Sequence, residues 1–260
     1  MKILYLNPVG TDKYDVFFKE YLKPIKASNC ELHIASLKNS DTKIETIEYL
    51  ATEAAIAPKI VNAAWKASKE GFDAFIIGCF YDTALFACRE VSNRMFVVGP
   101  CQASVNLASA IANTFSIVIG IEKSSHTIKR NLIQYGKGDQ FLSFGITNQR
   151  VSEFQTNRSD TFSKISSAAK KCVDNNKAEA IILGCTLEAN YHTQLSRNLN
   201  VPVIDPSIAA LKTAELLASL SSHGSFYPSN SHTSKIAEEK ELICDGVIDE
   251  NFDFGNRIIV

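Results

Sequence analysis

The sequence has almost no net charge, at −1 for 27 basic and 28 acidic residues. Without an excess of Lys and Arg it has no electrostatic footprint for nucleic acid or for an anionic membrane. Its longest apolar runs are the size of strands, far shorter than a transmembrane helix requires. We therefore expect a protein that binds neither nucleic acid nor a membrane.

The motifs of common cofactor and metal sites are also missing. No Gly-x-Gly-x-x-Gly follows a predicted strand, and no Gly-x4-Gly-Lys-[Ser/Thr] phosphate loop occurs. No spacing of Cys and His is typical of zinc, so we predict no metal site. The seven cysteines are odd in number and contain no Cys-x-x-Cys pair, a pattern that does not indicate a disulfide framework.

The apolar run over residues 3–6 is too short for the core of a signal peptide, and Asn7 and Pro8 follow it directly. We expect this run to be the first strand, and the cysteines to be reduced thiols in the cytoplasm.

Short apolar runs alternate with longer amphipathic stretches, which predicts an α/β fold with mostly parallel sheets. We predict strands over residues 2–6, 31–36, 74–78, 95–99, 115–120, 140–146, 179–184 and 201–204. We predict helices over residues 12–26, 52–70, 83–92, 102–113, 123–135, 159–176, 188–199 and 207–220. The Ser-rich stretch 221–234 is predicted to be a loop, followed by a hairpin or tail with its turn at Asp245-Gly246.

An apolar strand that ends in Gly-Cys occurs twice, at Cys79 and at Cys185. Pro100 and Pro206 each follow their cysteine at the same distance of 21 residues. Such self-similarity predicts two matched α/β halves. If the halves face each other across a pseudo-twofold axis, the two cysteines lie opposite one another.

Both cysteines are predicted at the carboxyl end of a strand, where open α/β sheets bind ligands, and just before a helix. The N-terminus of a helix stabilises a thiolate. A thiolate and a thiol on opposite faces of an acidic carbon form a base and an acid, which can invert a stereocentre without a cofactor. A single buried cysteine is more often a packing residue, but two at equivalent points of a repeat favour catalysis.

Other polar residues have a structural and a functional interpretation. Cys88 and Cys172 fall on apolar helix faces and are predicted core residues, and His192 is predicted on a helix surface. Cys101 follows another strand-to-helix turn, so it either packs or lines the site.

The stretch Phe80-Tyr81-Asp82 directly follows the first cysteine. Tyr81 and Asp82 are typical of the lead-in and N-cap of the next helix, although Phe80 and Tyr81 are also candidates to wall the site. Thr186 is a candidate cap whose hydroxyl could instead hold a substrate oxygen.

The stretches GCFYD, GPCQAS, ILGCT and VPVIDPSIAALK together resemble the aspartate/glutamate/hydantoin racemase superfamily over about residues 1–220. GCFYD resembles the hydantoin racemase branch, whereas the amino-acid racemases tend to show Cys-Asn-Thr at the first cysteine. The resemblance implies two Rossmann-like α/β domains with the active site between them, no pyridoxal phosphate or other cofactor, and catalytic roles for Cys79 and Cys185. It also implies that Asn7 reaches the site, although Val9-Gly10-Thr11 replace the commoner residues there.

The family's last helix returns to the first domain, so we expect a first domain over residues 1–98 plus 207–260 and a second over residues 99–206. Residues 221–260 depart from the family. We expect a homo-oligomer in which this tail either covers an interface or takes no part in catalysis.

Our first hypothesis is an isomerase that inverts C5 of 5-substituted hydantoins or of a related cyclic ureide such as allantoin. Backbone N–H groups together with Asn7, Gln102 and Thr186 would hold the neutral ring of this small-molecule substrate. An aspartate or glutamate racemase is the alternative with the same chemistry. A non-catalytic ligand-binding relative is the alternative from another class, because a fold alone does not establish activity.

Overall fold

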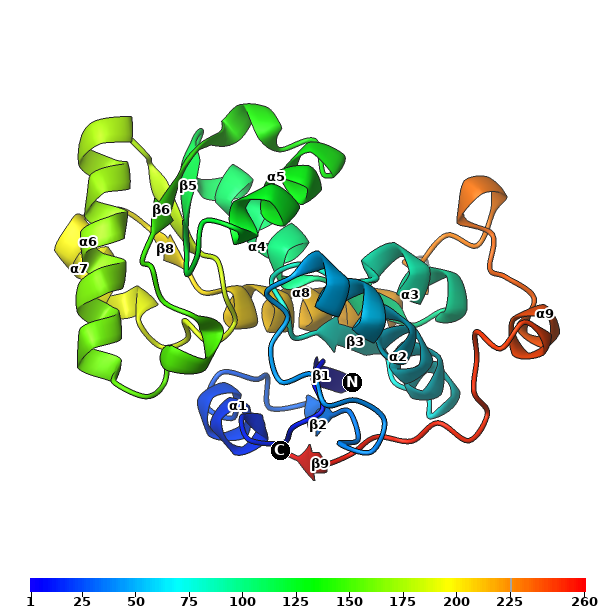
Figure 1. Ribbon diagram of the computed structural model, residues 1–260. Helices are drawn as coiled ribbons and strands as arrows, with labels where there is room; N and C mark the ends of the chain where they lie inside the picture. The colour runs from blue at the N-terminus through cyan, green and yellow to red at the C-terminus, as the bar shows by residue number, and fades with distance from the viewer. Residues whose placement is uncertain (225) are drawn as a thin grey trace. The chain divides into compact units, whose positions relative to one another are not determined.

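The computed structural model describes residues 1–224 and 226–260 (Figure 1). Their contacts divide the chain into two compact units. Unit 1 comprises Met1–Cys79, Thr83–Gly99 and Leu211–Val260, and unit 2 comprises Phe80–Asp82 and Pro100–Ala210. Among the described residues, no helix combines the length and the apolar character that crossing a bilayer would need.

Unit 1 is built on a five-stranded sheet in the order β4-β3-β1-β2-β9. Four strands are parallel: β1 (Lys2–Asn7), β2 (Glu31–Ser36), β3 (Ala74–Ile77) and β4 (Phe96–Val98). The last strand, β9 (Arg257–Ile259), runs antiparallel to β2. The helices of this unit are α1 (Asp15–Leu22), α2 (Leu50–Lys69), α3 (Leu85–Val91) and α9 (Glu239–Cys244), with a short 3-10 helix η3 (His232–Ser234).

Unit 2 contains a four-stranded parallel sheet in the order β6-β5-β7-β8. Its strands are β5 (Phe115–Ile119), β6 (Phe141–Ile146), β7 (Ala180–Leu183) and β8 (Val203–Ile204). Its helices are α4 (Pro100–Ile111), α5 (Ser124–Gln134), α6 (Arg158–Asn176) and α7 (His192–Leu199), with 3-10 turns η1 (Gly138–Gln140) and η2 (Val151–Glu153). Helix α8 (Pro206–Ser221) begins in unit 2 and continues in unit 1.

The two sheets repeat one topology. Read from the other side, the order in unit 2 is β8-β7-β5-β6, which matches β4-β3-β1-β2 strand for strand. In both units the first strand is central, and the strand that precedes the cysteine pairs with it. The predicted α/β class and the predicted internal repeat are confirmed.

The strands before the two cysteines have no exposed face. All four residues of β3 (AFII) and all four of β7 (AIIL) are buried. Strands of parallel sheets are covered on both faces, so they consist of continuous apolar residues rather than alternating ones. Each buried Ile, Leu or Phe stabilises the fold by about 1.5–3 kcal/mol, which anchors the strand ends that carry the cysteines.

The predicted C-terminal hairpin is wrong. Residues 239–244 form helix α9, and Gly246 (φ 71°) ends it, with hydrogen bonds from Gly246 N to Ile243 O and from Val247 N to Leu242 O. A glycine in this left-handed conformation is the usual end of a helix, so Asp-Gly here is a helix stop rather than a hairpin turn. The chain then crosses unit 1 to add β9 beside β2 (Figure 1).

Candidate active site

The sheet itself requires the glycine before each cysteine. A Cβ on Gly78 would lie 2.4 Å from the carbonyl oxygen of Leu6 in β1, and a Cβ on Gly184 would lie 2.5 Å from that of Val118 in β5. The same two carbonyls accept the glycine N–H groups, both at 2.7 Å. A side chain cannot fit where a hydrogen-bonded backbone approaches so closely. Gly-Cys therefore occurs twice because each cysteine lies one residue beyond the last hydrogen bond to the central strand.

The strand-end cysteines differ from most other cysteines in exposure. Cys79 and Cys185 are partly exposed, and Cys244 is exposed in α9. Four cysteines are buried, namely Cys30, Cys88, Cys101 and Cys172. Burial raises the pKa of three of these four thiols, to about 11 for Cys30. Such thiols stay protonated and unreactive at neutral pH, and the predicted core positions of Cys88 and Cys172 are confirmed.

The two helices that follow the cysteines begin later in the chain than the sequence predicts, which places their starts at residues 83 and 188. Helix α3 begins at Leu85 and α7 at His192. The fifth residue after each cysteine, Ala84 (φ 59°) or Asn190 (φ 66°), adopts the left-handed conformation, which cannot continue a right-handed helix. The helix N-termini that the sequence places next to the thiols thus lie further along the chain from Cys79 and Cys185 than expected.

Asp82 caps a helix, but not the one that the sequence predicts. Its buried carboxylate accepts the backbone N–H groups of Cys101 at 2.9 Å and Gln102 at 2.8 Å, at the N-terminus of α4. The hydroxyl of Tyr135 donates to the same carboxylate at 2.8 Å. Because Gly99 precedes α4 and has no side chain, the cap for this helix comes from the segment that follows Cys79.

Unit 2 caps α8 in a different way. Asp205 lies directly before the helix, and its Oδ1 accepts the N–H groups of Ser207 at 2.9 Å and Ile208 at 3.2 Å. Its Oδ2 accepts the N–H of Asn190 at 3.2 Å. The Ser207 hydroxyl, at the position equivalent to Cys101, donates to the carbonyl of Thr186 at 3.4 Å. The turn after Cys185 is thus joined to the start of α8.

Glu188, which no sequence motif identifies, is fully buried three residues after Cys185. Burial raises the pKa of this carboxyl well above its usual range, and the Asp205 carboxylate acts in the same direction. The backbone N–H groups of Gly184 and Cys185 oppose the shift. Glu188 occupies the position equivalent to Asp82, and that equivalence in the repeat is the signal that could have identified it.

In unit 1, Asn7 ends β1 next to the strand that leads to Cys79. Its Nδ2 donates to the carbonyl of Thr11 at 3.0 Å and to Oδ1 of Asp15 at 3.1 Å. Nδ2 of Asn256 donates to the other oxygen of Asp15 at 3.1 Å. Burial raises the pKa of Asp15, whereas these hydrogen bonds lower it. Both partners of the Asn7 side-chain nitrogen are hydrogen-bond acceptors. The NH2 group must therefore face them, and the side-chain carbonyl oxygen points away from them.

The remaining candidate residues lie in unit 2. Phe80 and Tyr81 are buried, and Tyr81 donates from its hydroxyl to Ser124 Oγ at 2.6 Å and accepts Nδ2 of Asn131 at its carbonyl at 2.7 Å. Cys101 and Gln102 meet Asp82 through their backbones, as described above. Unit 1 thus brings Asn7 and Cys79 to the carboxyl ends of adjacent strands. In unit 2, Cys185 and Thr186 both follow the carboxyl end of β7.

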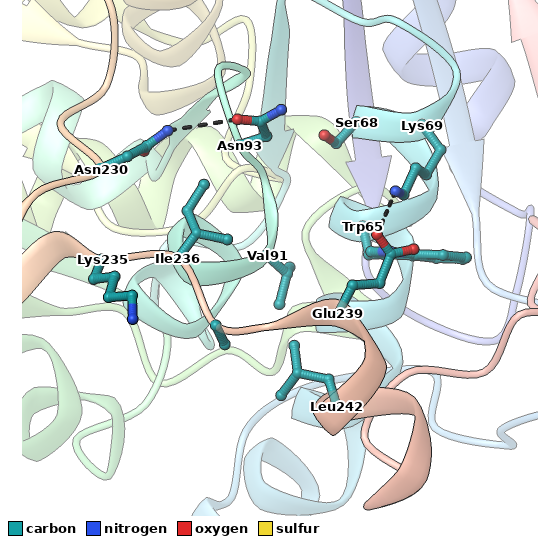
Figure 2. Close-up of a pocket in the computed structure, with 11 residues that line it drawn as sticks. Trp65, Ser68, Lys69, Val91, Asn93, Asn230, Lys235, Ile236, Glu239 and Leu242 are labelled. Carbon is teal, nitrogen blue, oxygen red and sulfur yellow. Dashed lines mark hydrogen bonds and ion pairs between the residues drawn. The ribbon is translucent and has the colours of Figure 1, made fainter.

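Two of the hollows among the described residues of unit 1 lie at different ends of its strands. One of about 540 Å³ lies beside the carboxyl ends of β1 and β2 and includes Gly10, Ser36 and Asn256. Another of about 580 Å³ lies between α2, the end of α3 and the C-terminal segment (Figure 2). There Lys69 pairs with Glu239 at 2.5 Å. This second hollow adjoins the helix ends that lead into β3 and β4, so it is not a candidate site for chemistry at the cysteines.

Comparison with known proteins gives consistent matches. The sequence model of the Asp/Glu/Hydantoin racemase family matches residues 3–214. The chain is 31% identical over 245 residues to a hydantoin racemase of Pseudomonas sp. (strain NS671), a match that covers 94% of each protein. It is 31% identical over 221 residues to a hydantoin racemase of Paenarthrobacter aurescens, which covers 85% of this chain and 92% of that protein.

A solved structure agrees with these sequence matches. The allantoin racemase from Klebsiella pneumoniae superposes with a TM-score of 0.84 at 25% identity, over 92% of this chain and 94% of that one.

Proposed function

This chain belongs to the Asp/Glu/Hydantoin racemase family and is an isomerase of the racemase type, and we propose that it inverts C5 of 5-substituted hydantoins or of the related ureide allantoin. Cys79 and Cys185 are the proposed base and acid. The observation that carries this proposal is the pair of partly exposed thiols at equivalent strand ends of a repeated fold.

The proposed reaction needs only two proton transfers. The thiolate of one cysteine removes the C5 proton, and the electron pair of the C–H bond moves into the neighbouring carbonyl to form an enolate. The thiol of the other cysteine then delivers its proton to the opposite face of C5, and the enolate pair becomes the new C–H bond. One thiolate and one thiol remain with their roles exchanged, so the reverse direction uses the same machinery.

The Asn7 side chain supports a ureide substrate over an amino acid. Its amide N–H groups are both engaged by Thr11 and Asp15, so the group it can offer a ligand is a hydrogen-bond acceptor. Hydantoin and allantoin rings carry N–H donors that an acceptor can bind. The α-carboxylate of aspartate or glutamate needs donors instead and would be repelled by the carbonyl oxygen of Asn7. The names of the relatives agree with this preference.

An amino-acid racemase remains the second candidate, because Gly-Cys-Thr at residues 184–186 resembles a motif found across the superfamily. Backbone N–H groups and the hydroxyl of Thr186 would then hold the carboxylate. An assay of racemisation with both kinds of substrate separates the two candidate functions, because each function acts on a different substrate.

The test is circular dichroism of enantiopure hydantoins, allantoin, aspartate and glutamate, each incubated with the protein and without added cofactor. We expect loss of optical activity for one or more ureides and none for the amino acids. Cys79→Ser and Cys185→Ser should each lower the rate at least about 1,000-fold, in the range of lost acid–base catalysis.

Cys244→Ser is the matched control, because this cysteine is exposed in α9, far along the chain from either Gly-Cys turn, and should keep the wild-type rate. Racemisation of amino acids alone would overturn the proposed substrate. Wild-type rates in either variant of the two strand-end cysteines would overturn the mechanism.

A further inference from the structure

Two of the three residues after Cys79, Tyr81 and Asp82, are held by several hydrogen bonds. Asp82 accepts two backbone N–H groups of α4 and the hydroxyl of Tyr135, all between 2.8 and 2.9 Å. Tyr81 makes two more hydrogen bonds: its hydroxyl donates to Ser124, and its backbone carbonyl accepts the side-chain N–H of Asn131. Five hydrogen bonds therefore join residues 81 and 82 to α4, to α5 and to Tyr135 directly after α5, all within unit 2, whereas Cys79 belongs to unit 1.

Capping α4 does not by itself require this arrangement. Asp205 shows that the equivalent helix α8 is capped by the residue directly before it, whose second oxygen then bonds Asn190 in the turn after Cys185. At α4 the local position is Gly99, and the carboxylate comes from a residue 19 positions before Cys101. Asp82 also adopts the left-handed conformation (φ 51°), which is unfavourable for a non-glycine residue. A cap supplied by the residue directly before α4 would avoid this strain. The cap supplied by Asp82 has an effect beyond capping, because it also fixes the chain after Cys79.

We propose that Asp82 is a positioning residue for Cys79: it anchors the segment 80–82 to the N-terminus of α4 and so holds the first thiol where it can reach C5. This inference rests on the proposed function. Consecutive Cα atoms are 3.8 Å apart, so an anchor three residues away limits how far the cysteine can move. In the turn after Cys185 the residue equivalent to Asp82 is Glu188. It is buried and does not cap α8, because Asp205 already caps that helix.

The positioning role predicts an asymmetry that racemisation rates cannot reveal. The two enantiomers have equal free energies, so kcat/KM for inversion must be equal in both directions in every variant. The rate at which the C5 hydrogen exchanges with deuterated solvent, in contrast, can differ between the two enantiomers. Cys79 abstracts the proton of one enantiomer and Cys185 that of the other, and a carbanion can be reprotonated on the face from which it was formed.

The experiment measures C5 deuteration by NMR, and configuration by chiral chromatography, for each enantiomer of 5-methylhydantoin with the Asp82→Asn variant. A blank without enzyme is subtracted at the same pH. Cys79→Ser defines which enantiomer depends on Cys79. For that enantiomer we expect both exchange and inversion to fall by about 10- to 100-fold, the effect of misplacing a catalytic group by up to 1 Å. For the other enantiomer, exchange with retention should stay within about twofold of wild type while inversion falls.

Two further variants separate positioning from loss of folding. Tyr135→Phe removes one bond to Asp82 and leaves both N–H caps, so it should show the same asymmetry at a smaller size, whether or not Asp82→Asn folds fully. Asn157→Ala removes the N-cap of α6 in the same unit and should lower stability without asymmetry. Equal losses of exchange from both enantiomers in Asp82→Asn and Tyr135→Phe would overturn the positioning role. If the wild-type protein racemises no hydantoin, the proposed function fails first.

Discussion

Replacing Gly184 by alanine tests whether close backbone approach dictates the Gly-Cys turn. The new Cβ would lie 2.5 Å from the carbonyl oxygen of Val118, about 0.9 Å inside the ordinary contact distance of about 3.4 Å. That oxygen cannot turn away cheaply, because it accepts the N–H of Gly184 at 2.7 Å. The Cβ would also meet the side chain of Ile119 at 2.7 Å.

The expected loss of stability can be worked from these contacts. Overpacking a core by one methyl group costs about 1–3 kcal/mol, and losing the hydrogen bond to Val118 adds about 0.5–1.5 kcal/mol. We expect a total of about 2–4 kcal/mol, which lowers Tm by roughly 4–16 °C at about 2–4 °C per kcal/mol. Because Cys185 must shift with the turn, activity should fall by about 100-fold even at temperatures where the variant is folded.

The assay is thermal unfolding by circular dichroism, paired with racemisation measured well below Tm. Gly138→Ala is the matched control in the same unit, because its Cβ would meet only a side-chain atom of Ile133 at 3.8 Å. That control should shift Tm by less than about 2 °C. A Gly184→Ala protein with wild-type Tm and wild-type activity would refute the steric explanation of the repeated Gly-Cys.

Two other predictions concern buried polar groups. The pKa of Glu188 is raised above its usual value of 4.5, so the favourable contribution of the protonated side chain is complete below about pH 4.5 and is lost as pH rises through the folded-state pKa. Glu188→Gln cannot ionise and should gain Tm relative to wild type as pH is raised from 5 to 9; a constant difference across that range would contradict a buried neutral acid. Asn256→Ala removes one partner of Asp15 and loosens the support of Asn7, so we expect KM to rise about three- to tenfold with little change in kcat. Asn251→Ala, at an exposed position of the same segment, should leave KM unchanged, and an equal rise in both variants would argue against the Asn256–Asp15–Asn7 connection.

The strands could be located from the sequence because their signal is local. Runs such as AFII and AIIL are apolar throughout, and the structure places β3 and β7 on them. The starts of α3 and α7 could not be predicted, because the left-handed conformation of Ala84 has no signal in a residue that ordinarily favours helices. The hairpin turn predicted at Asp245-Gly246 is wrong because the same pair of residues occurs both at helix ends and in hairpin turns, and only the neighbouring hydrogen bonds distinguish the two.

The candidate cysteines could be found from the repeat, whereas the residues that support them could not. Asp82 is a residue type that is common at the N-cap of the next helix, but the backbone N–H groups that it accepts belong to residues 19 and 20 positions later. Glu188 resembles any polar residue after a strand until its burial is known. Asn256 supports Asp15 across 241 positions, a distance at which sequence spacing carries no information.

The pairing of β9 with β2 has a consequence for how the chain folds. Ile34 and Ile258 pair across 224 positions, so this contact closes one of the longest loops in the protein. Until it forms, β2 presents an open row of backbone N–H and C=O groups at the margin of an otherwise complete parallel sheet. Such an unprotected margin is a template for pairing with another copy of the chain. The three residues of β9 thus act as a cover against aggregation, and the interval before they dock is the time at which the protein is most exposed to it.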